Sequence, residues 1–245
     1  MNIAVVTGGA SGIGAATAIR LARDGFAVAV WDRTVDAAAR VAADIETSGG
    51  RAYAVGVDVG DVASVESAAA ATREVLGVAT ALVNCAGIRD LIPFFDLTAA
   101  DWQKVVSVCL SGPFHCTRAL APGMKERGSG TVVNIGSIAS LVSRPDRTAY
   151  VSSKAGLLGL TRSNAEDLGR FGIRVNCVAP GFIETPLGSQ SRSAADTLAH
   201  VERIPLGRIG SPDDVADVVS FFCNDASRYV TGTVLPVDGG RMVVY

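Results

Sequence analysis

The stretch Thr7-Gly8-Gly9-Ala10-Ser11-Gly12-Ile13-Gly14 stands between an apolar run, Ile3 to Val6, and an Ala-rich stretch of helical composition. A strand followed by a glycine loop and a helix presents free backbone N–H groups and a helix N-terminus to a phosphate. Gly8, Gly12 and Gly14 let the backbone turn tightly and approach a pyrophosphate. No Gly-Lys-Ser/Thr ends the loop, so it is not a P-loop for a triphosphate. The stretch predicts nucleotide binding, although a plain turn between a strand and a helix would also explain it.

Length, composition and charge favour a small-molecule ligand. The chain has 245 residues, 49% of them apolar, and can bury a sizeable core. Its formal net charge of -2 gives no electrostatic footprint for nucleic-acid binding. The chain enters an apolar strand without a basic leader, and no apolar stretch approaches the length of a membrane span. We therefore expect a cytoplasmic protein with no nucleic-acid or membrane partner.

The cysteines and histidines indicate neither a metal site nor disulfides. Five cysteines are scattered without a Cys-x-x-Cys pair, and the chain has only two histidines, His115 and His200. We expect buried free thiols and no metal ion.

Short apolar runs alternate with stretches of helical composition. The runs lack the polar alternation of half-exposed strands, which predicts strands covered on both faces. Regular alternation of strands and helices predicts right-handed crossovers in a parallel sheet. The expected strands are 2–7, 27–31, 52–57, 81–84, 131–135, 174–178 and 234–237. The expected helices are 12–24, 35–47, 62–76, 101–127, 150–168 and 212–223.

These elements predict an α/β fold, a single doubly wound Rossmann-type domain over residues 1–245. Its seven-stranded parallel sheet carries helices on both faces. One long irregular segment, at about 181–204, is polar and carries Ser and Arg, which predicts a lid over the site.

Residues that close the expected strands fall where ligands bind in such sheets, beyond the carboxyl ends. Asp32 closes the second strand, 18 residues after Gly14. A carboxylate there can accept hydrogen bonds from an adenosine ribose diol and repels a 2′-phosphate, which favours NAD over NADP. Arg33 could instead receive a phosphate, but Ser11, rather than a basic residue, stands within the glycine loop.

Tyr150 and Lys154 are four residues apart and share one face of the expected helix, about 5–6 Å apart at Cβ. A tyrosine is a poor acid or base at neutral pH because its usual pKa is about 10, and a neighbouring ammonium stabilises the phenolate. Ser137, after the fifth strand, could hold a substrate oxygen. A tyrosine and a lysine at this spacing also fit an exposed helix face. Their coincidence with the glycine loop and Asp32 favours general acid–base catalysis.

Seven stretches of the chain stand in a characteristic order. They are residues 7–14, Asp58-Val59, Asn84-Cys85-Ala86-Gly87, Asn134-Ile135-Gly136-Ser137, Tyr150-Val151-Ser152-Ser153-Lys154, residues 180–185 (Pro-Gly-Phe-Ile-Glu-Thr) and Val237-Asp238-Gly239-Gly240. In this order they closely resemble the short-chain dehydrogenase/reductase family over nearly the whole chain. The resemblance implies an enzyme that transfers a hydride between NAD(H) and a secondary alcohol or ketone. It also implies a homotetramer built through helices 101–127 and 150–168 and the C-terminal region.

The resemblance also implies the roles of individual residues. Ser137 would orient the substrate oxygen, Tyr150 would transfer its proton, and Lys154 would assist Tyr150 while holding the nicotinamide ribose. The adenine would contact Asp58 and Val59, the ribose the turn from Asn84 to Gly87, and the carboxamide Ile183 and Thr185. The full set expected to bind the cofactor is Gly8, Ser11, Gly12, Ile13, Gly14, Asp32, Arg33, Asp58, Val59, Asn84, Ala86, Gly87, Tyr150, Lys154, Pro180, Gly181, Ile183 and Thr185.

Cys109 departs from the family pattern, because most members carry an asparagine at this position, associated with a helix kink and a water-binding backbone carbonyl. Pro113 lies four residues later and lacks the N–H that would bond this carbonyl. We expect Pro113 to keep the kink, so that Cys109 is tolerated.

Two other functions fit parts of the sequence. A 3-oxoacyl-carrier-protein reductase would prefer NADP(H) and bind an acidic carrier through basic residues near Arg127 or Arg170, and Asp32 argues against it. A non-catalytic nucleotide sensor would be expected to have lost Ser137, Tyr150 or Lys154, and all three are present. The substrate is left open, with Arg144 as a candidate contact for an anionic group. Further candidates for the pocket are Arg89, Phe94, Leu141, Phe182, Leu187 and Arg192.

Overall fold

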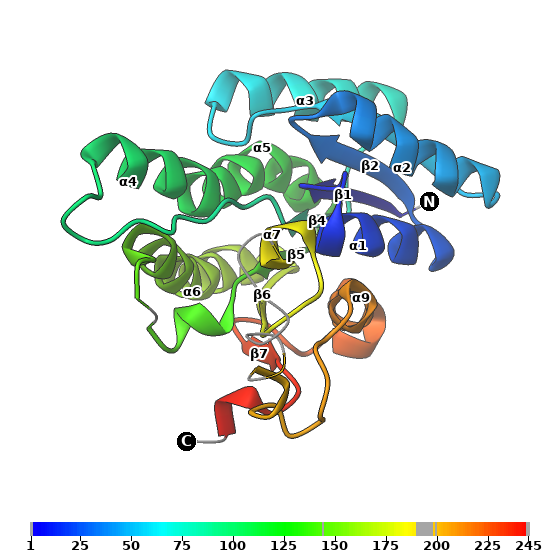
Figure 1. Cartoon of the computed structure of the whole chain (residues 1–245). Helices are drawn as coiled ribbons and strands as arrows, with labels where there is room; N and C mark the ends of the chain where they lie inside the picture. Colours follow the sequence, from blue (N-terminus) through cyan, green and yellow to red (C-terminus); the bar gives the residue numbers. More distant parts are fainter. Residues whose placement is uncertain (1, 144, 190–197, 199, 244–245) are drawn as a thin grey trace.

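The computed structural model describes residues 2–143, 145–189, 198 and 200–243, and a seven-stranded sheet forms its centre (Figure 1). All neighbouring strands are parallel, in the order β3-β2-β1-β4-β5-β6-β7. This confirms the predicted fold class. The strands are β1 (Ile3–Thr7), β2 (Ala27–Asp32), β3 (Arg51–Gly56), β4 (Ala81–Asn84), β5 (Gly130–Ile135), β6 (Ile173–Pro180) and β7 (Val234–Val237).

Helices cover both faces of the sheet. One face carries α1 (Gly12–Arg23), α2 (Val35–Thr47) and α9 (Pro212–Cys223), and the other carries α3 (Val62–Val75), α5 (Gly112–Arg127) and α6 (Thr148–Gly169). Two shorter helices are α4 (Ala99–Val106) and α7 (Pro186–Ser189). None of the helices in the described ranges is both long and apolar enough to cross a membrane.

Alternate residues of the central strands face the two helical layers. In β1, Ile3 and Val5 pack in the core under α3 and α5, while Ala4 and Val6 pack in the core under α1 and α2. All four side chains are buried. A strand covered on both faces needs apolar residues at every position, which explains the unbroken apolar run before the glycine loop.

The chain changes direction across the sheet at β1, which lies between β2 and β4. At such a switch point a crevice opens beyond the carboxyl ends of the strands. Thr7, the last residue of β1, is tied there to the turn after β4, because its hydroxyl oxygen accepts hydrogen bonds from the N–H groups of Cys85 (3.0 Å) and Ala86 (3.1 Å). The glycine loop and the turn after β4 are thereby held side by side.

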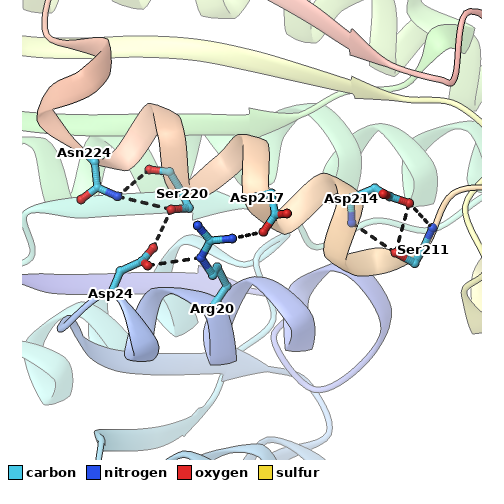
Figure 2. A network of polar contacts seen from close by, with 7 residues as sticks. All are labelled: Arg20, Asp24, Ser211, Asp214, Asp217, Ser220 and Asn224. Carbon is cyan, nitrogen blue, oxygen red and sulfur yellow. Dashed lines mark hydrogen bonds and ion pairs between the residues drawn. The ribbon is translucent and has the colours of Figure 1, made fainter.

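Polar side chains fasten α1 to α9 (Figure 2). Arg20 of α1 forms ion pairs with Asp24 and with Asp217 of α9. The hydroxyl of Ser220, also on α9, donates a hydrogen bond to the carboxylate of Asp24. The helix that follows the glycine loop is therefore fixed both to the sheet and to a helix from near the end of the chain.

The predicted helix 101–127 is interrupted in the structure. α4 ends at Val106, a π-helical turn spans Ser107–Ser111, and α5 continues from Gly112. The N–H of Gly112 bonds to the carbonyl of Ser107, five residues earlier. Pro113 follows directly, and a residue without an N–H is expected beside such a break.

Candidate active site

A cavity of about 570 Å³ lies beyond the carboxyl ends of the strands. Its lining includes the glycine loop, the ends of β2, β5 and β6, and the first turns of α6. Of the residues predicted to act in catalysis or cofactor binding, all except Asn84 line this cavity. The structure therefore brings the predicted residues together, while their roles toward a ligand stay predictions.

Glycines of the loop stand where a side chain would be crowded or strained. Gly8 has a φ of +64°, and a Cβ there would lie 2.8 Å from the Cα of Ala86. Gly12 has a φ of +51° and lies close to the side chain of Thr185. Ser11 precedes α1 but makes no capping hydrogen bond with its side chain. The loop thus forms a cradle of backbone groups at a helix N-terminus, which suits a pyrophosphate.

Asp32 lies beside this cradle at the end of β2. Its two carboxylate oxygens accept hydrogen bonds from the N–H of Ala10 (3.2 Å) and the N–H of Thr34 (2.9 Å). A carboxylate has about four lone-pair sites, so each oxygen can accept one further bond from a ligand hydroxyl. The neighbouring Arg33 is exposed and also lines the cavity.

Asn84 does not line the cavity, contrary to the prediction from its place at a strand end. It is 2% exposed, and its amide nitrogen donates to Oδ1 of Asn134 on the neighbouring strand (2.8 Å). The side chain therefore lies between the sheet and its helices. The cavity instead receives the next residues of this turn, Cys85, Ala86 and Gly87.

Ser137 follows β5 and has extended backbone angles. Its hydroxyl oxygen accepts a hydrogen bond from the N–H of Ala139 (3.1 Å), and its own N–H donates to the hydroxyl of Ser140 (3.3 Å). These bonds fix the position of the Ser137 oxygen. Its O–H hydrogen is left to donate, so this residue can bind a carbonyl or hydroxyl oxygen in the cavity.

Tyr150 and Lys154 lie one turn apart on α6, as predicted. The Nζ of Lys154 lies 5.8 Å from the centre of the Tyr150 ring and donates a hydrogen bond to the carbonyl oxygen of Ile135 (2.6 Å). Lys154 is 4% exposed. A buried ammonium held beside a phenol stabilises negative charge on the phenol oxygen.

Two opposing effects act on the pKa of the buried Lys154. Desolvation alone would lower the pKa of Lys154, but the nearby acidic groups of Tyr150 and of three cysteines favour the ammonium and raise this pKa above its usual value. The net effect of these surroundings favours the ammonium form of Lys154.

Asp90 fixes the start of α6, a role that the sequence did not reveal. This buried carboxylate accepts hydrogen bonds from the N–H of Ala149 (3.1 Å) and the N–H of Tyr150 (3.0 Å). Arg147, the residue before the helix, makes no side-chain capping bond. Asp90 therefore acts as the helix cap from 60 residues upstream and holds the backbone of Tyr150 in place.

The residues expected near the substrate divide into three groups. Arg89, Phe182 and Leu187 line the cavity, together with Arg147 and His200, which the sequence analysis did not single out. Phe94 and Leu141 are exposed and lie outside the lining. Arg144 and Arg192 lie outside the described residues, as do residues 190–197 and 199 of the predicted lid.

Comparisons with known proteins cover nearly the whole chain. A family model described as enoyl-(acyl carrier protein) reductase matches residues 8–241. The chain is 37% identical over 248 residues to 2-(S)-hydroxypropyl-CoM dehydrogenase 3 of Xanthobacter autotrophicus, covering 99% of this chain and 97% of that protein. It is 36% identical over 242 residues to a 3-oxoacyl-[acyl-carrier-protein] reductase of Thermotoga maritima, covering 99% and 98%. A gluconate 5-dehydrogenase of Burkholderia cenocepacia, solved with NADP and tartrate, has a TM-score of 0.95 at 33% identity, covering 100% and 96%.

The chain belongs to the short-chain dehydrogenase/reductase family. It is therefore an oxidoreductase that transfers a hydride between a nicotinamide dinucleotide and a secondary alcohol or ketone.

Within this short-chain dehydrogenase/reductase, Cys109 lies in the π-helical turn and is fully buried. Its thiol donates a hydrogen bond to the carbonyl oxygen of Ile88 (3.2 Å) and accepts one from the N–H of the same residue (3.4 Å). Ile88 lines the cavity. A thiol thus makes both a donor and an acceptor contact at the position where the resemblance leads us to expect an amide.

Proposed function

We propose that this short-chain dehydrogenase/reductase uses NAD(H), with Tyr150 as general acid–base, Ser137 as the group that orients the substrate oxygen, and Lys154 as the cation that assists Tyr150. The observation that carries the proposal is the meeting of these three side chains in one cavity with the glycine loop. A glycine cradle that a Cβ would fill suits the pyrophosphate of a dinucleotide. The bound nicotinamide supplies the acceptor or donor of the hydride.

The residues of the chain transfer one proton to or from the substrate oxygen. In alcohol oxidation the ionised Tyr150 oxygen takes the hydroxyl proton as the hydride leaves the carbon, and in ketone reduction the phenol returns a proton to the oxygen. Ser137 donates a hydrogen bond to this oxygen in both directions. Lys154, held by the carbonyl of Ile135, places a positive charge beside the Tyr150 ring.

The preference for NAD rests on Asp32. Both of its oxygens are held by backbone N–H groups, so the carboxylate cannot readily turn away from the cavity. A 2′-phosphate placed there would meet a negative charge. The related gluconate 5-dehydrogenase was solved with NADP, so family membership alone does not decide the cofactor, and the local charge is the argument for this chain.

A 3-oxoacyl-carrier-protein reductase is the second candidate, because the matching family model and the Thermotoga relative are both named for acyl-carrier substrates. The basic residues considered for carrier docking argue against it. Arg127 and Arg170 lie at the C-terminal ends of α5 and α6, which precede the starts of β5 and β6. Within one subunit they are therefore at the opposite edge of the sheet from Tyr150.

We further propose the homotetramer that the family resemblance implies. Trp102 of α4 and Phe114 of α5 are 38% and 50% exposed, and Val243 near the C-terminus is 76% exposed. Apolar side chains exposed on these segments would be covered by subunit contacts. Light scattering would test this, and a monomer at micromolar concentration would contradict it. The lid at about 181–204 and the cytoplasmic location stay predictions.

The decisive experiment compares the wild type with Tyr150→Phe. Cofactor binding is followed by fluorescence, and turnover by nicotinamide absorbance with a panel of secondary alcohols and ketones. Because the substitution removes only the transferable proton, turnover should fall by about 10²- to 10⁴-fold while the Kd for NADH stays close to the wild-type value. Near-normal turnover by Tyr150→Phe would remove Tyr150 from the reaction.

A further inference from the structure

Charge is unevenly distributed along the cavity. Among the described residues that line it, the acids are Asp32 and Asp58, which follow β2 and β3 at the end predicted to hold adenosine. The other end, around Tyr150, is lined by Arg89, Arg147 and the buried Lys154. The described lining around Tyr150 therefore carries cationic side chains, of which Arg147 is the candidate for a contact with the substrate.

Arg147 is the cation best placed to meet a substrate. It is the N-cap residue of α6, three residues before Tyr150, and both residues line the cavity. Its guanidinium forms no hydrogen bond or ion pair with any residue of the described ranges. A guanidinium presents a planar fork of donors that fits a carboxylate or phosphate with two parallel hydrogen bonds.

The backbone around this charge is held rigidly. Asp90 joins the segment of Arg89 to the start of α6 through its bonds to Ala149 and Tyr150. A second tie is the hydrogen bond from the N–H of Ile92 to the carbonyl of Asp146 (3.0 Å). Both Asp90 oxygens are engaged by backbone N–H groups, and no ion pair joins Asp90 to Arg147. These bonds join residues 89–92 to residues 146–150, and the backbone of each arginine is therefore held in place.

Part of the described lining of the cavity is apolar and aromatic. Phe182, which follows β6, stacks on His200 with ring centres 4.0 Å apart, and Leu187 lies in the same lining. The same cavity therefore offers a ligand both apolar surface and cationic side chains. Such a lining suits a molecule with a carbon skeleton and one anionic group.

We propose that Arg147 forms an oxyanion subsite, so that the substrate is a secondary alcohol or ketone that also carries a carboxylate or phosphate. This inference rests on the proposed function, because it places the anion relative to the reacting carbon, whose oxygen contacts Tyr150 and Ser137. Arg147 is a specificity-determining residue in this assignment and takes no part in the proton transfer.

The test uses matched ketones with and without the anion. The carboxylate arm compares 3-oxobutanoate, 4-oxopentanoate and 5-oxohexanoate with their methyl esters, and the phosphate arm compares dihydroxyacetone phosphate with dihydroxyacetone. For the preferred length and anion, kcat/KM of the wild type should exceed that of the uncharged partner by about tenfold or more, since a charge-assisted bond is gained. The arm with the larger ratio identifies the anion.

Variants assign the effect to Arg147. Arg147→Ala should lower kcat/KM for the charged ketone by about 10- to 100-fold, mainly through KM, and leave the uncharged ketone and the Kd for NADH little changed. Arg147→Lys should restore part of the loss, because it returns the charge without the fork. Arg40→Ala, which removes an exposed arginine of α2 outside the cavity, is the control for net charge and should change neither substrate.

A binding measurement separates this inference from the proposed function. The same charged ketones are titrated calorimetrically into Tyr150→Phe with NADH bound, with and without Arg147→Ala. If a charged ketone binds and Arg147→Ala abolishes this binding, the subsite is supported even when no ketone in the panel is reduced. The absence of reduction would contradict the proposed function and leave the subsite standing. The inference is overturned if charged and uncharged ketones bind and react equally well, if Arg147→Ala affects both alike, or if no charged ketone binds.

Discussion

A side chain on Gly14 would overlap the backbone carbonyl of Gly8, because the first turn of α1 packs directly against the loop that precedes it. Gly14→Ala should therefore displace the loop, weaken NADH binding by at least about tenfold and lower the Tm. Fluorescence titration and thermal unfolding would measure both effects. Gly56→Ala is the matched control, since its Cβ would meet only Val35 at an ordinary distance of 3.6 Å. Equal behaviour of the two variants would show that the loop tolerates displacement.

The charge of Asp32 should set the cofactor preference. In the wild type kcat/KM should be higher with NAD than with NADP, and Asp32→Ala should narrow this ratio because it removes the repulsion of the 2′-phosphate. Asp32→Asn removes the charge but keeps one of the two acceptor oxygens, so it disturbs the loop less than Asp32→Ala does. Asp36→Ala, on the exposed start of α2, is the control. A wild-type preference for NADP would mean that Arg33 outweighs the carboxylate.

Asp214 should make stability depend on acid pH. It forms a capping box with Ser211 and a two-bond ion pair with Arg208 (2.6 and 2.7 Å). The hydrogen bonds from Arg208 hold the pKa of Asp214 well below its usual range, against an opposing effect of burial. A group whose pKa is lower in the folded state stabilises the fold above its unfolded value, about 3.9 for aspartate, and loses this contribution as the pH falls.

Asp214→Asn should therefore lower the free energy of unfolding by about 1 kcal/mol at pH 7, and the difference from the wild type should shrink below about pH 4. Denaturant unfolding at several pH values would measure this. Asp213→Asn, its exposed neighbour in the same first turn, is the control. A difference for Asp214→Asn as large at pH 3 as at pH 7 would contradict the assignment.

The two bonds between Cys109 and Ile88 should matter for stability. Cys109→Ala leaves the N–H and carbonyl of Ile88 without these partners and should cost about 1–3 kcal/mol. Cys109→Ser can make both bonds and should be closer to the wild type. Cys116→Ala, which truncates another buried thiol, is the control for lost packing.

Activity of the same variants tests whether the thiol limits the reaction. Cys109→Asn, which installs the residue expected from the family, should change kcat only modestly, because the π-helical turn and Pro113 already keep the helix kinked. A rise in kcat by orders of magnitude would show that the native proton path is impaired.

The strand ends could be read from the sequence because a parallel sheet collects them at one edge, whatever the details of the helices. Asn84 shows the limit of this reasoning. It is in register with Asn134 on β5, and the pleat directs its side chain toward that neighbour instead of the cavity. Strand position alone predicts the edge of the sheet, but the face of the last residue depends on the neighbouring strand.

Contacts between distant segments could not be predicted in the same way. Asp90 caps a helix that begins 58 residues later, and no local spacing marks an acid for that task. The π-helical turn is a second case. Pro113 indicates a break in the helix, but the bond from Gly112 to Ser107 depends on how α4 and α5 pack on the rest of the protein.

The polar contacts between α1 and α9 have a consequence for the newly made protein. Asp24 and Ser220, which are joined by a hydrogen bond, are 196 residues apart. The glycine loop and α1 therefore leave the ribosome long before α9, which packs on α1, has been synthesised. Contacts this distant in sequence form late. A nascent chain that ends before α9 should carry the complete nucleotide-binding motif and still hold a nucleotide poorly. Translation of the last few dozen residues, more than that of the motif itself, would decide when the enzyme becomes competent.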